Sequence, residues 1–427
     1  MNITALRQTI SGAVRLPGEP GYDEQRQALN PAVDAHPVAI VEAACPADVR
    51  AAVATAAEHG LPVAVQATGH GTHVPSDGAL LVRTTAMAAV LVDPDRRIAK
   101  VGPGARWGQV LAAAAPSGLA PLSGSSPAVG VTGYTLGGGL GWLARRHGFA
   151  ADHVTRAEIV TAEGRQLTVG PDQHPDLFWA IRGGGGNFGV VTSLEFRLHP
   201  VSQVYAGITY FEYSDDAVAA YRDWTATIPE TTSTALMLTA IPDGPFQGRR
   251  VVGVKVMHQG DAEEAGRILR PLRAALGPVV EDRTQVIAYR DAAMGGTPAR
   301  HLDLFETLPD AVVAPLAEAG RTATVEIRHW GGAIARGQAP VSHRATEFTV
   351  IVDAQVPGVA EALRPHASGG SFLNFLADPA RTTSAYATGD LRRLADIKRT
   401  YDPANVFRVG HAIAPTRPAD VRRAEGM

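Results

Sequence analysis

The sequence predicts an α+β fold in two parts, and three observations indicate it. Glycine-rich stretches are concentrated before residue 204. From there on, alternating apolar runs with helical segments between them predict a mainly antiparallel sheet with helices on one face. The segment 391–415 reads as an amphipathic helix and a short extended piece, so we expect the end of the chain to pack back on the first part.

Composition excludes several classes of function. The net charge of -3 over 427 residues argues against a nucleic-acid or membrane-surface partner. Cys45 is the only cysteine, which excludes an internal disulfide and a multi-thiolate metal site. No stretch approaches the roughly 20 apolar residues that cross a bilayer, and residues 1–7 lack the basic segment and long apolar run that are typical of a signal peptide. We therefore expect a cytoplasmic protein.

The first part begins with a polar segment, 1–35, which we expect to be a surface lead-in. Strand-like runs at 37–43 and 61–65 flank a helical run at 46–57, which predicts a β-α-β unit. The loop after residue 65 then follows the carboxyl end of the second strand, where α/β folds commonly bind ligands. Further elements are expected as a hairpin at 90–101, a helix from 104, a hairpin at 157–169, a helix at 176–182 and a strand at 193–198.

The loop after this strand carries His70 between Gly69 and Gly71. Glycines let backbone N–H groups approach a phosphate or a ring, and a neutral imidazole is a good nucleophile. Our hypothesis is that His70 is bonded covalently to a flavin and that the loop cradles its pyrophosphate. An ordinary turn is the alternative. His70 and His73 also form an HxxH pair, but no further ligand lies nearby, so no metal is expected.

Two other glycine-rich stretches, 123–142 and 183–189, have backbone that can come close to a ligand. Residues 139–144 match the GxGxxA dinucleotide fingerprint. A Rossmann unit needs a parallel β-α-β arrangement, whereas an antiparallel hairpin follows here, so we reject that reading.

Five stretches in the same order resemble the berberine bridge enzyme-like FAD oxidases of the vanillyl-alcohol oxidase and p-cresol methylhydroxylase superfamily. They are Gln66–Thr72, Pro127–Gly141, Asp176–Thr192, Ser371–Phe375 and Tyr401–Pro415. The resemblance implies a p-cresol methylhydroxylase-type FAD-binding domain made from 1–203 and 391–427. An antiparallel-sheet substrate domain, 204–390, is inserted between these segments.

By this resemblance, His70 matches the histidine bonded to the flavin 8α-methyl carbon. Ser126 stands where members with two flavin bonds have cysteine, so a single link is implied, as in the bacterial 6-hydroxynicotine oxidases. A small residue at Val129 implies O2 as electron acceptor. The tail reads Gly-His-Ala at 410–412 where the family has Asn-x-Asn, which makes His411 a replacement donor. The implied FAD-binding residues are Gln66, Ala67, Thr68, Gly69, His70, Gly71, Thr72, Ser125, Ser126, Val129, Gly130, Gly133, Asp152, Val154, Val191 and His411.

The candidates for a catalytic base are Glu326, His329 and Tyr386, although none lies in a specific motif. The expected function is two-electron oxidation of a small alcohol, amine, sugar or natural-product intermediate, with O2 reduced to H2O2. Oxidative cyclisation in a biosynthetic pathway stays open. A flavin dehydrogenase with another acceptor and a non-redox flavin- or ligand-binding relative are the alternatives. We expect a monomer or a homodimer with a small-molecule substrate.

Overall fold

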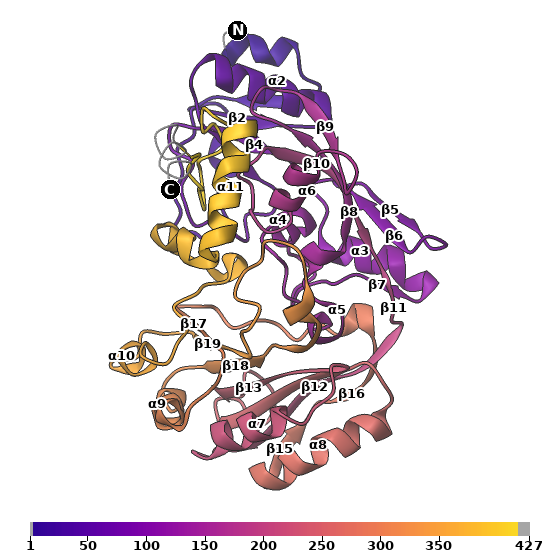
Figure 1. Cartoon of the computed structure of the whole chain (residues 1–427), viewed down its shortest axis with the longest axis vertical. Helices are drawn as coiled ribbons and strands as arrows, with labels where there is room; N and C mark the ends of the chain where they lie inside the picture. The colour runs from indigo at the N-terminus through magenta and orange to yellow at the C-terminus, as the bar shows by residue number, and fades with distance from the viewer. Residues whose placement is uncertain (1–2, 417–427) are drawn as a thin grey trace, which may run out of the picture.

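The computed structural model describes residues 3–416 and stacks two sheet-based parts along the long axis of the molecule (Figure 1). Strands β1 to β11 build the first part, and β12 to β19 form one large antiparallel sheet in the second. Helix α11 (Thr388–Tyr401) returns to the first part and lies beside its sheets (Figure 1). The predicted α+β class and the antiparallel second sheet are therefore confirmed.

The first sheet contains the strand that leads to His70. Its order is β1-β2-β4-β3, and both β2 and β3 run parallel to β4. The expected β-α-β unit exists, but β4 lies between its two strands. The lead-in expected on the surface was wrong: β1 pairs with β2, and Leu6 is fully buried. The strands are β1 (Ala13–Arg15), β2 (Ala39–Glu42), β3 (Val63–Gln66) and β4 (Leu80–Arg83).

A second, antiparallel sheet of the first part has the order β5-β6-β10-β8-β9, which confirms both predicted hairpins. A short pair, β7 with β11, lies next to it. These strands are β5 (Val90–Asp93), β6 (Ile98–Val101), β7 (Leu119–Ala120), β8 (Val154–Val160), β9 (Gln166–Val169), β10 (Val190–Arg197) and β11 (His199–Pro200).

The helices predicted at 46–57 and 176–182 are present as α2 and α6, whereas the helix predicted from 104 begins three residues later, at Trp107. Pro46 opens α2, since a proline at the first position loses no helical hydrogen bond, and Gly118 ends the α3–η2 segment with a φ of 66°. The helical segments are η1 (Ile3–Gln8), α1 (Tyr22–Gln25), α2 (Pro46–Glu58), α3 (Trp107–Ala114), η2 (Ala115–Ser117), α4 (Val131–Leu136), α5 (Ala144–His147), η3 (Ala150–His153) and α6 (Pro175–Ile181).

The second part is an eight-stranded sheet with two different faces. Its main order is β15-β12-β14-β13-β18-β19-β17, and β16 also pairs with β12. The strands are β12 (Gln203–Glu212), β13 (Thr232–Ala240), β14 (Arg250–His258), β15 (Val279–Asp282), β16 (Gln285–Ala288), β17 (His301–Phe305), β18 (Val325–His329) and β19 (Phe348–Val352).

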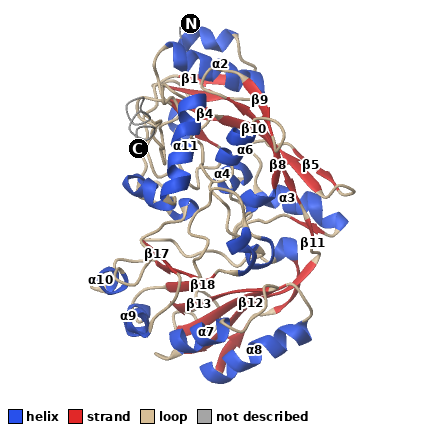
Figure 2. Ribbon diagram, in the orientation of Figure 1, coloured by secondary structure: helices blue, strands red, loops and turns tan. Residues whose placement is uncertain are grey.

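Helices α7, α8 and α9 cover the outer face of this sheet, on the side away from the first part (Figure 2). Residues such as Leu236, Val254 and Ile327 point to them. Because side chains alternate along a strand, the neighbouring residues point to the first part, where Ala235 and Met257 pack in one cluster with Trp142 and Leu122. The inner face of the sheet therefore lies at the boundary between the two parts.

The helical segments of the second part and the tail are α7 (Ala217–Thr225), α8 (Ala262–Leu276), η4 (Tyr289–Asp291), α9 (Asp310–Gly320), η5 (Gly332–Arg336), α10 (Val359–Leu363), η6 (Leu373–Phe375), η7 (Pro379–Ala385) and α11. None of the helices within 3–416 has the length and apolar character that a bilayer crossing requires. After α11 the chain up to residue 416 forms no strand, so the extended piece expected there is irregular.

Candidate cofactor and substrate site

His70 lies in a tight turn directly after β3. Gly69 has a φ of 76°, and a Cβ there would come within 3.0 Å of the Leu29 backbone nitrogen. On the other side, Gly71 is exposed, and a Cβ there would meet no heavy atom within 4 Å. One glycine is therefore needed for the turn itself, and the other leaves the backbone open to an approaching group.

The imidazole of His70 is half-buried and is oriented by one hydrogen bond. Its Nδ1 lies 3.0 Å from Oγ1 of Thr68. Burial lowers the pKa of His70 below the usual value for histidine, and the positive charge of Arg106 lowers this pKa further. The ring is therefore neutral at physiological pH, which is the form that acts as a nucleophile.

A second segment, 129–136, lies against this turn. A Cβ on Gly130 would come within 3.3 Å of Oγ1 of Thr68, so the two loops pack closely. Gly133 is exposed, and open space surrounds the position of its missing Cβ. At the end of α4, the Leu136 carbonyl accepts a hydrogen bond from Gly185 N–H at 3.0 Å, which joins this segment to the glycine loop at 183–189.

Asn187 ties the glycine loop to the tail of the chain. Its Nδ2 donates to the carbonyls of Gly184 at 2.7 Å and of His411 at 2.9 Å. Its Oδ1 accepts from the N–H of Ile413 at 2.8 Å. One buried amide therefore sets the distance between two backbone segments that are far apart in the sequence.

Lys398 of α11 fixes the backbone of Asn187 by a hydrogen bond. Its Nζ is fully buried and donates to the Asn187 carbonyl, to the Asp402 carboxylate and to the Phe407 carbonyl, at 2.7 to 2.8 Å. Asp402 also accepts from the N–H groups of Val406 and Phe407. The returning tail is thus held by a buried ion pair in which all three lysine protons have an acceptor.

The joined segments fit the FAD that the sequence resemblance implies. Each contributes at least one glycine whose missing Cβ would meet no heavy atom within 4 Å: Gly71, Gly133, Gly186 and Gly410. Oγ1 of Thr132, beside one of these glycines, is buried without a hydrogen-bond partner in the described chain. Open backbone N–H groups of this kind suit a pyrophosphate and a ring better than side chains would.

The residues predicted around His70 form hydrogen bonds within the loop and to neighbouring protein groups. Gln66 is buried, and its Nε2 donates to the Gln27 carbonyl at 2.8 Å while its Oε1 accepts from Oγ1 of Thr72 at 3.3 Å. The carbonyl of Ala67 accepts from Oγ1 of Thr85 at 3.2 Å. These hydrogen bonds fix the conformation of the loop and occupy its polar side chains. A ligand would therefore contact the exposed backbone at Gly71.

The serines of the second segment also bond within the protein. Oγ of Ser125 accepts from the indole N–H of Trp142 at 3.1 Å, and Oγ of Ser126 accepts from the N–H of Ala128 at 3.3 Å. Val129 is partly buried and packs on the core of the first part. The structure thus brings Val129 and Gly130 next to the His70 turn.

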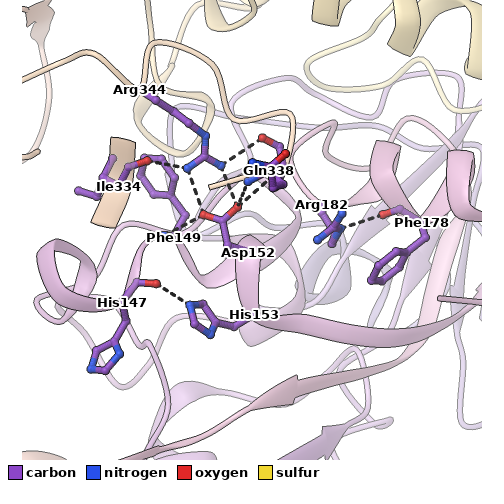
Figure 3. A network of polar contacts seen from close by, with 10 residues as sticks. His147, Phe149, Asp152, His153, Phe178, Arg182, Ile334, Gln338 and Arg344 are labelled. Atoms are coloured by element: carbon purple, nitrogen blue, oxygen red, sulfur yellow. Dashed lines mark hydrogen bonds and ion pairs between the residues drawn. The ribbon is translucent and has the colours of Figure 1, made fainter. Parts of the chain in front are cut away.

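Asp152 lies in a network that connects the two parts (Figure 3). Its carboxylate accepts from Nη1 and Nη2 of Arg344 at 3.1 and 2.8 Å, and from the N–H groups of Gln338, Ala339 and Phe149 at 3.1 to 3.2 Å. The Arg344 guanidinium also lies 5.0 Å from the Phe149 ring centroid. Since protein donors fill this carboxylate, the Asp152 side chain is engaged within the protein, and its contact with the cofactor stays a prediction.

Three further predicted positions have side chains turned into the protein. Val154 and Val191 belong to the core cluster of the first part. Nε2 of His411 lies 2.8 Å from the Leu376 carbonyl, and Nδ1 lies 3.0 Å from Oγ1 of Thr382. The His411 ring therefore links the tail to residues 376–382, and neither ring nitrogen is left to donate to a flavin.

Glu326 is fully buried on the inner face of the sheet. Its carboxylate accepts from Arg328 at 2.7 and 3.1 Å, from Oγ1 of Thr297 at 2.7 Å and from Nζ of Lys255 at 3.3 Å. Burial alone would raise its pKa, but the charges of Arg328 and Lys255 lower the pKa to about 2. A carboxylate held this firmly in its ionised form is a weak base.

The other two candidates lie elsewhere. Burial lowers the pKa of His329 to about 4, and its ring nitrogens lie 2.7 and 2.8 Å from Nη1 of Arg145. Tyr386 is buried in the first part and donates to the Gly183 carbonyl at 3.2 Å, and burial raises its pKa. The three predicted bases therefore do not meet in one place.

Sequence reasoning missed the cations around Glu326. Lys255 and Arg328 both lie opposite Ala235 in the sheet register, although β14 and β18 are far apart in the sequence. A charged residue inside the apolar alternation of β14 was a signal for Lys255. Nothing in the sequence pairs Arg145 with this region, because only the packing of the two parts brings it there.

Family comparison agrees with the site geometry. Residues 37–170 match the model described as an FAD binding domain, and residues 371–414 match the model described as berberine and berberine like. The first range contains the His70 turn and Gly130, and the second contains the tail segment that Asn187 holds. Among the described residues, no group of three or more histidine, cysteine or acidic side chains could hold a metal ion.

Similar proteins cover nearly the whole chain. An FAD-linked oxidoreductase of Bacillus subtilis (strain 168) is 28% identical over 96% of this chain and 99% of its own length. (R)-6-hydroxynicotine oxidase of Paenarthrobacter nicotinovorans is also 28% identical, over 95% of this chain and 97% of its own. The solved structure of the Physcomitrella patens BBE-like 1 protein has a TM-score of 0.86 at 22% identity, over 98% of this chain and 100% of that one.

Proposed function

The chain belongs to the berberine bridge enzyme-like FAD-linked oxidoreductases, and from this premise we propose that it is an oxidase whose FAD is bonded covalently to His70 alone. The observation that carries the proposal is the neutral, half-buried His70 imidazole in a turn where Gly71 leaves the backbone open. With Nδ1 oriented by Thr68, the ring presents Nε2 for the bond.

A single link follows from the thiol content of the chain. Ser126 occupies the position of the second attachment site, and its Oγ hydrogen bonds to the loop backbone. Cys45 lies before α2 and its Sγ contacts the Asp48 carboxylate. Because the chain has no other cysteine, His70 is the sole attachment point in this proposal.

When bound, FAD would supply the redox chemistry, a two-electron oxidation of the substrate in which O2 would take up the two electrons and two protons as H2O2. The protein holds the cofactor through backbone at the His70 turn, the 129–136 segment and the glycine loop. The inner face of the sheet orients the substrate. Of the three predicted bases, we retain His329 as proton acceptor at a ring nitrogen, because among the three it is the one that lines the cavity between the two parts.

Removing the imidazole tests the link. In His70→Ala, acid-precipitated protein should be colourless, whereas precipitated wild type should stay yellow. His73→Ala is the matched control, because it removes a neighbouring imidazole and should leave the precipitate yellow. Circular dichroism should show native secondary structure in both variants. A yellow precipitate from His70→Ala would reject His70 as the attachment point.

The acceptor is tested by reducing the enzyme anaerobically and then admitting air. Val129 is small and lies beside the His70 turn, which favours access of O2. Reoxidation within seconds, with H2O2 formed in equal amount to substrate, supports an oxidase. Slow reoxidation that an artificial acceptor accelerates would indicate a flavin dehydrogenase. A flavin that no alcohol, amine, sugar or phenol bleaches would indicate a non-redox relative.

The remaining expectations stay within this proposal. They are the division at residues 203 and 390, a cytoplasmic location, a monomer or homodimer, and a place in natural-product oxidation or ring formation. The division follows the sheets, since the large sheet uses residues 203–352.

A further inference from the structure

The segment between η4 and β17, residues 292–300, crosses the large sheet from one side to the other. η4 follows β16, which pairs with β12 near one edge, whereas β17 forms the opposite edge. Four strands lie between β12 and β17, so at about 4.8 Å per strand spacing the segment must span roughly 24 Å. A segment of this length covers that distance only in a largely extended form. We call residues 292–300 the strap.

Two contacts place the strap on the inner face of the sheet. Met294 packs against the cluster that contains Trp142 of the first part and Ala235 of β13. Oγ1 of Thr297 donates to Oε2 of Glu326 at 2.7 Å. Both contacts are with the face of the sheet that lies at the boundary, so the strap covers that face beside the first part.

Few other interactions hold the strap. Within 3–416, no backbone N–H or C=O of residues 293–299 forms a hydrogen bond, and Thr297 makes the one side-chain hydrogen bond of this stretch. Gly295 has a φ of 64°, and a Cβ on Gly295 or Gly296 would meet no heavy atom within 4 Å. A segment with so few bonds opens at a low free energy, and a pair of glycines lets its backbone bend.

The groups next to Thr297 favour opening as well, because they are charged. Nζ of Lys255 lies 3.3 Å from the same Glu326 oxygen that accepts from Thr297, and Lys255 is only 3% exposed. Buried charges regain hydration when they are uncovered, so water that enters under the strap offsets part of the lost contact. The Thr297 hydroxyl is therefore the main polar group that keeps the strap closed.

We propose that the strap opens to admit substrate to the inner face of the sheet, and that the hydrogen bond from Thr297 to Glu326 holds it closed during the reaction. A closed strap excludes water from the boundary between the two parts. The role in substrate entry rests on the proposed oxidase function, whereas the opening itself does not. Thr297 is a positioning residue, since it acts on the strap and not on the substrate.

The lysines of the chain provide the test, because there are three of them in three different environments: Lys100, Lys255 and Lys398. Treatment of the full-length protein with N-hydroxysuccinimidyl acetate, followed by peptide mass spectrometry, measures the acetylation rate of each amine. The Lys100 side chain is 44% exposed and should react freely. Lys398 is fully buried in the first part and reports global unfolding, whereas Lys255 reports opening of the strap. Burial lowers the pKa of both buried lysines, so protonation does not separate them.

Three variants change the strap in known ways. Thr297→Val removes the hydroxyl at nearly constant shape, and Lys255 should be acetylated about 10-fold faster, as the loss of a hydrogen bond to a charged group predicts. Thr297→Ser keeps the hydroxyl and should stay within about 2-fold of the wild-type rate. Gly296 has no positive φ, so Gly296→Ala fits the closed strap. It should slow acetylation of Lys255 about 2-fold, because alanine restricts the open conformations.

Turnover tests the role in the reaction. With a substrate that bleaches the flavin, Thr297→Val should lower kcat about 3-fold or more, and Thr297→Ser should restore it. An unchanged kcat in Thr297→Val would overturn this role even if Lys255 reacts faster.

The acetylation pattern decides on the opening itself. Equal rates at Lys255 in wild type and Thr297→Val, a Thr297→Ser variant as fast as Thr297→Val, or equal acceleration at Lys398 would each overturn the proposal. Acetylation needs neither flavin nor turnover. A protein that oxidises nothing but shows the expected rates would therefore support the opening of the strap while contradicting the oxidase function.

Discussion

Two buried lysine–carboxylate pairs lie in the two parts of the molecule, and they are built differently. In the tail, Lys398 donates to Asp402 and to two backbone carbonyls, so each of its protons has an acceptor. On the sheet, Lys255 has one hydrogen bond, to Glu326, and the same carboxylate also binds Arg328. The first pair is saturated and neutral overall, whereas the second has surplus positive charge.

This difference distinguishes an ion pair that holds backbone in place from one whose charges are not balanced. A saturated buried pair holds backbone in one arrangement, and here that backbone is the glycine loop and the tail of the proposed cofactor site. On the sheet, two buried cations bind one carboxylate, and a buried charge without a counter-ion is costly. Burial alone therefore does not show whether the charges of an ion pair are balanced, whereas the count of donors and acceptors does.

The largest effect is expected from Lys398→Met. It leaves Asp402 buried without its counter-ion, and we expect it to lower the free energy of unfolding by about 3–5 kcal/mol. Lys255→Met is the matched change on the sheet. Because Arg328 still pairs with Glu326 and no unpaired carboxylate is left buried, its cost should be much smaller, at most about 1 kcal/mol. Urea unfolding of the flavin-loaded proteins measures both.

A double variant sharpens this result. Lys398→Met with Asp402→Leu removes both charges and should recover part of the lost stability, because no unpaired carboxylate remains buried. If Lys398→Met and Lys255→Met cost the same, the distinction between the two pairs does not hold.

A smaller effect is expected from pH. His329 has a pKa of about 4 in the folded protein against an ordinary value of 6.5, so the unfolded chain binds the proton more readily. Its contribution to stability is present above pH 6.5 and is lost as the pH falls from 6.5 to 4. Glu326, with a pKa of about 2 against 4.5, loses its contribution only as the pH falls from 4.5 to 2.

Between pH 7 and pH 5 we therefore expect the wild type to lose about 1–2 kcal/mol of stability through His329. In His329→Gln this loss should shrink. His199, whose pKa burial lowers to about 3, acts in the same direction and supplies the residual slope. Unfolding free energies at the two pH values measure the change, and an unchanged slope in His329→Gln would contradict a neutral buried imidazole.

The smallest effect on stability is expected from glycines of the His70 turn. Gly69→Ala places a side chain at a φ of 76° and against Leu29, which should cost about 1–2 kcal/mol. Gly71→Ala meets open space and should leave the melting temperature unchanged. If Gly71 faces the cofactor as we propose, the added methyl group should lower the flavin content. Thermal melting and the flavin-to-protein ratio separate the two roles, and normal flavin content in Gly71→Ala would show that Gly71 does not face the cofactor.

The cofactor half was largely predictable, because its information is local. Glycines around His70, the stretch at 183–189 and the returning tail can each be recognised from neighbouring residues. The family comparison covers the first and the last of these, within 37–170 and 371–414. The order of the first sheet was not predictable, since β4 inserts between β2 and β3. Asp152 was expected at the cofactor because the sequence does not show that Arg344 lies against it.

The fold class and the FAD family could be predicted from the sequence, because the glycine-rich stretches, the alternating apolar runs and the order of five motifs are all properties of neighbouring residues. The same motifs made His70 the predicted attachment point. Which groups surround Glu326 was decided only by folding. Lys255 and Arg328 meet through strand register across β13, and Arg145 lines one cavity with Arg328 only because the two parts pack together. Electrostatic interactions depend on distance in space, and distances between remote segments exist only once the chain is folded.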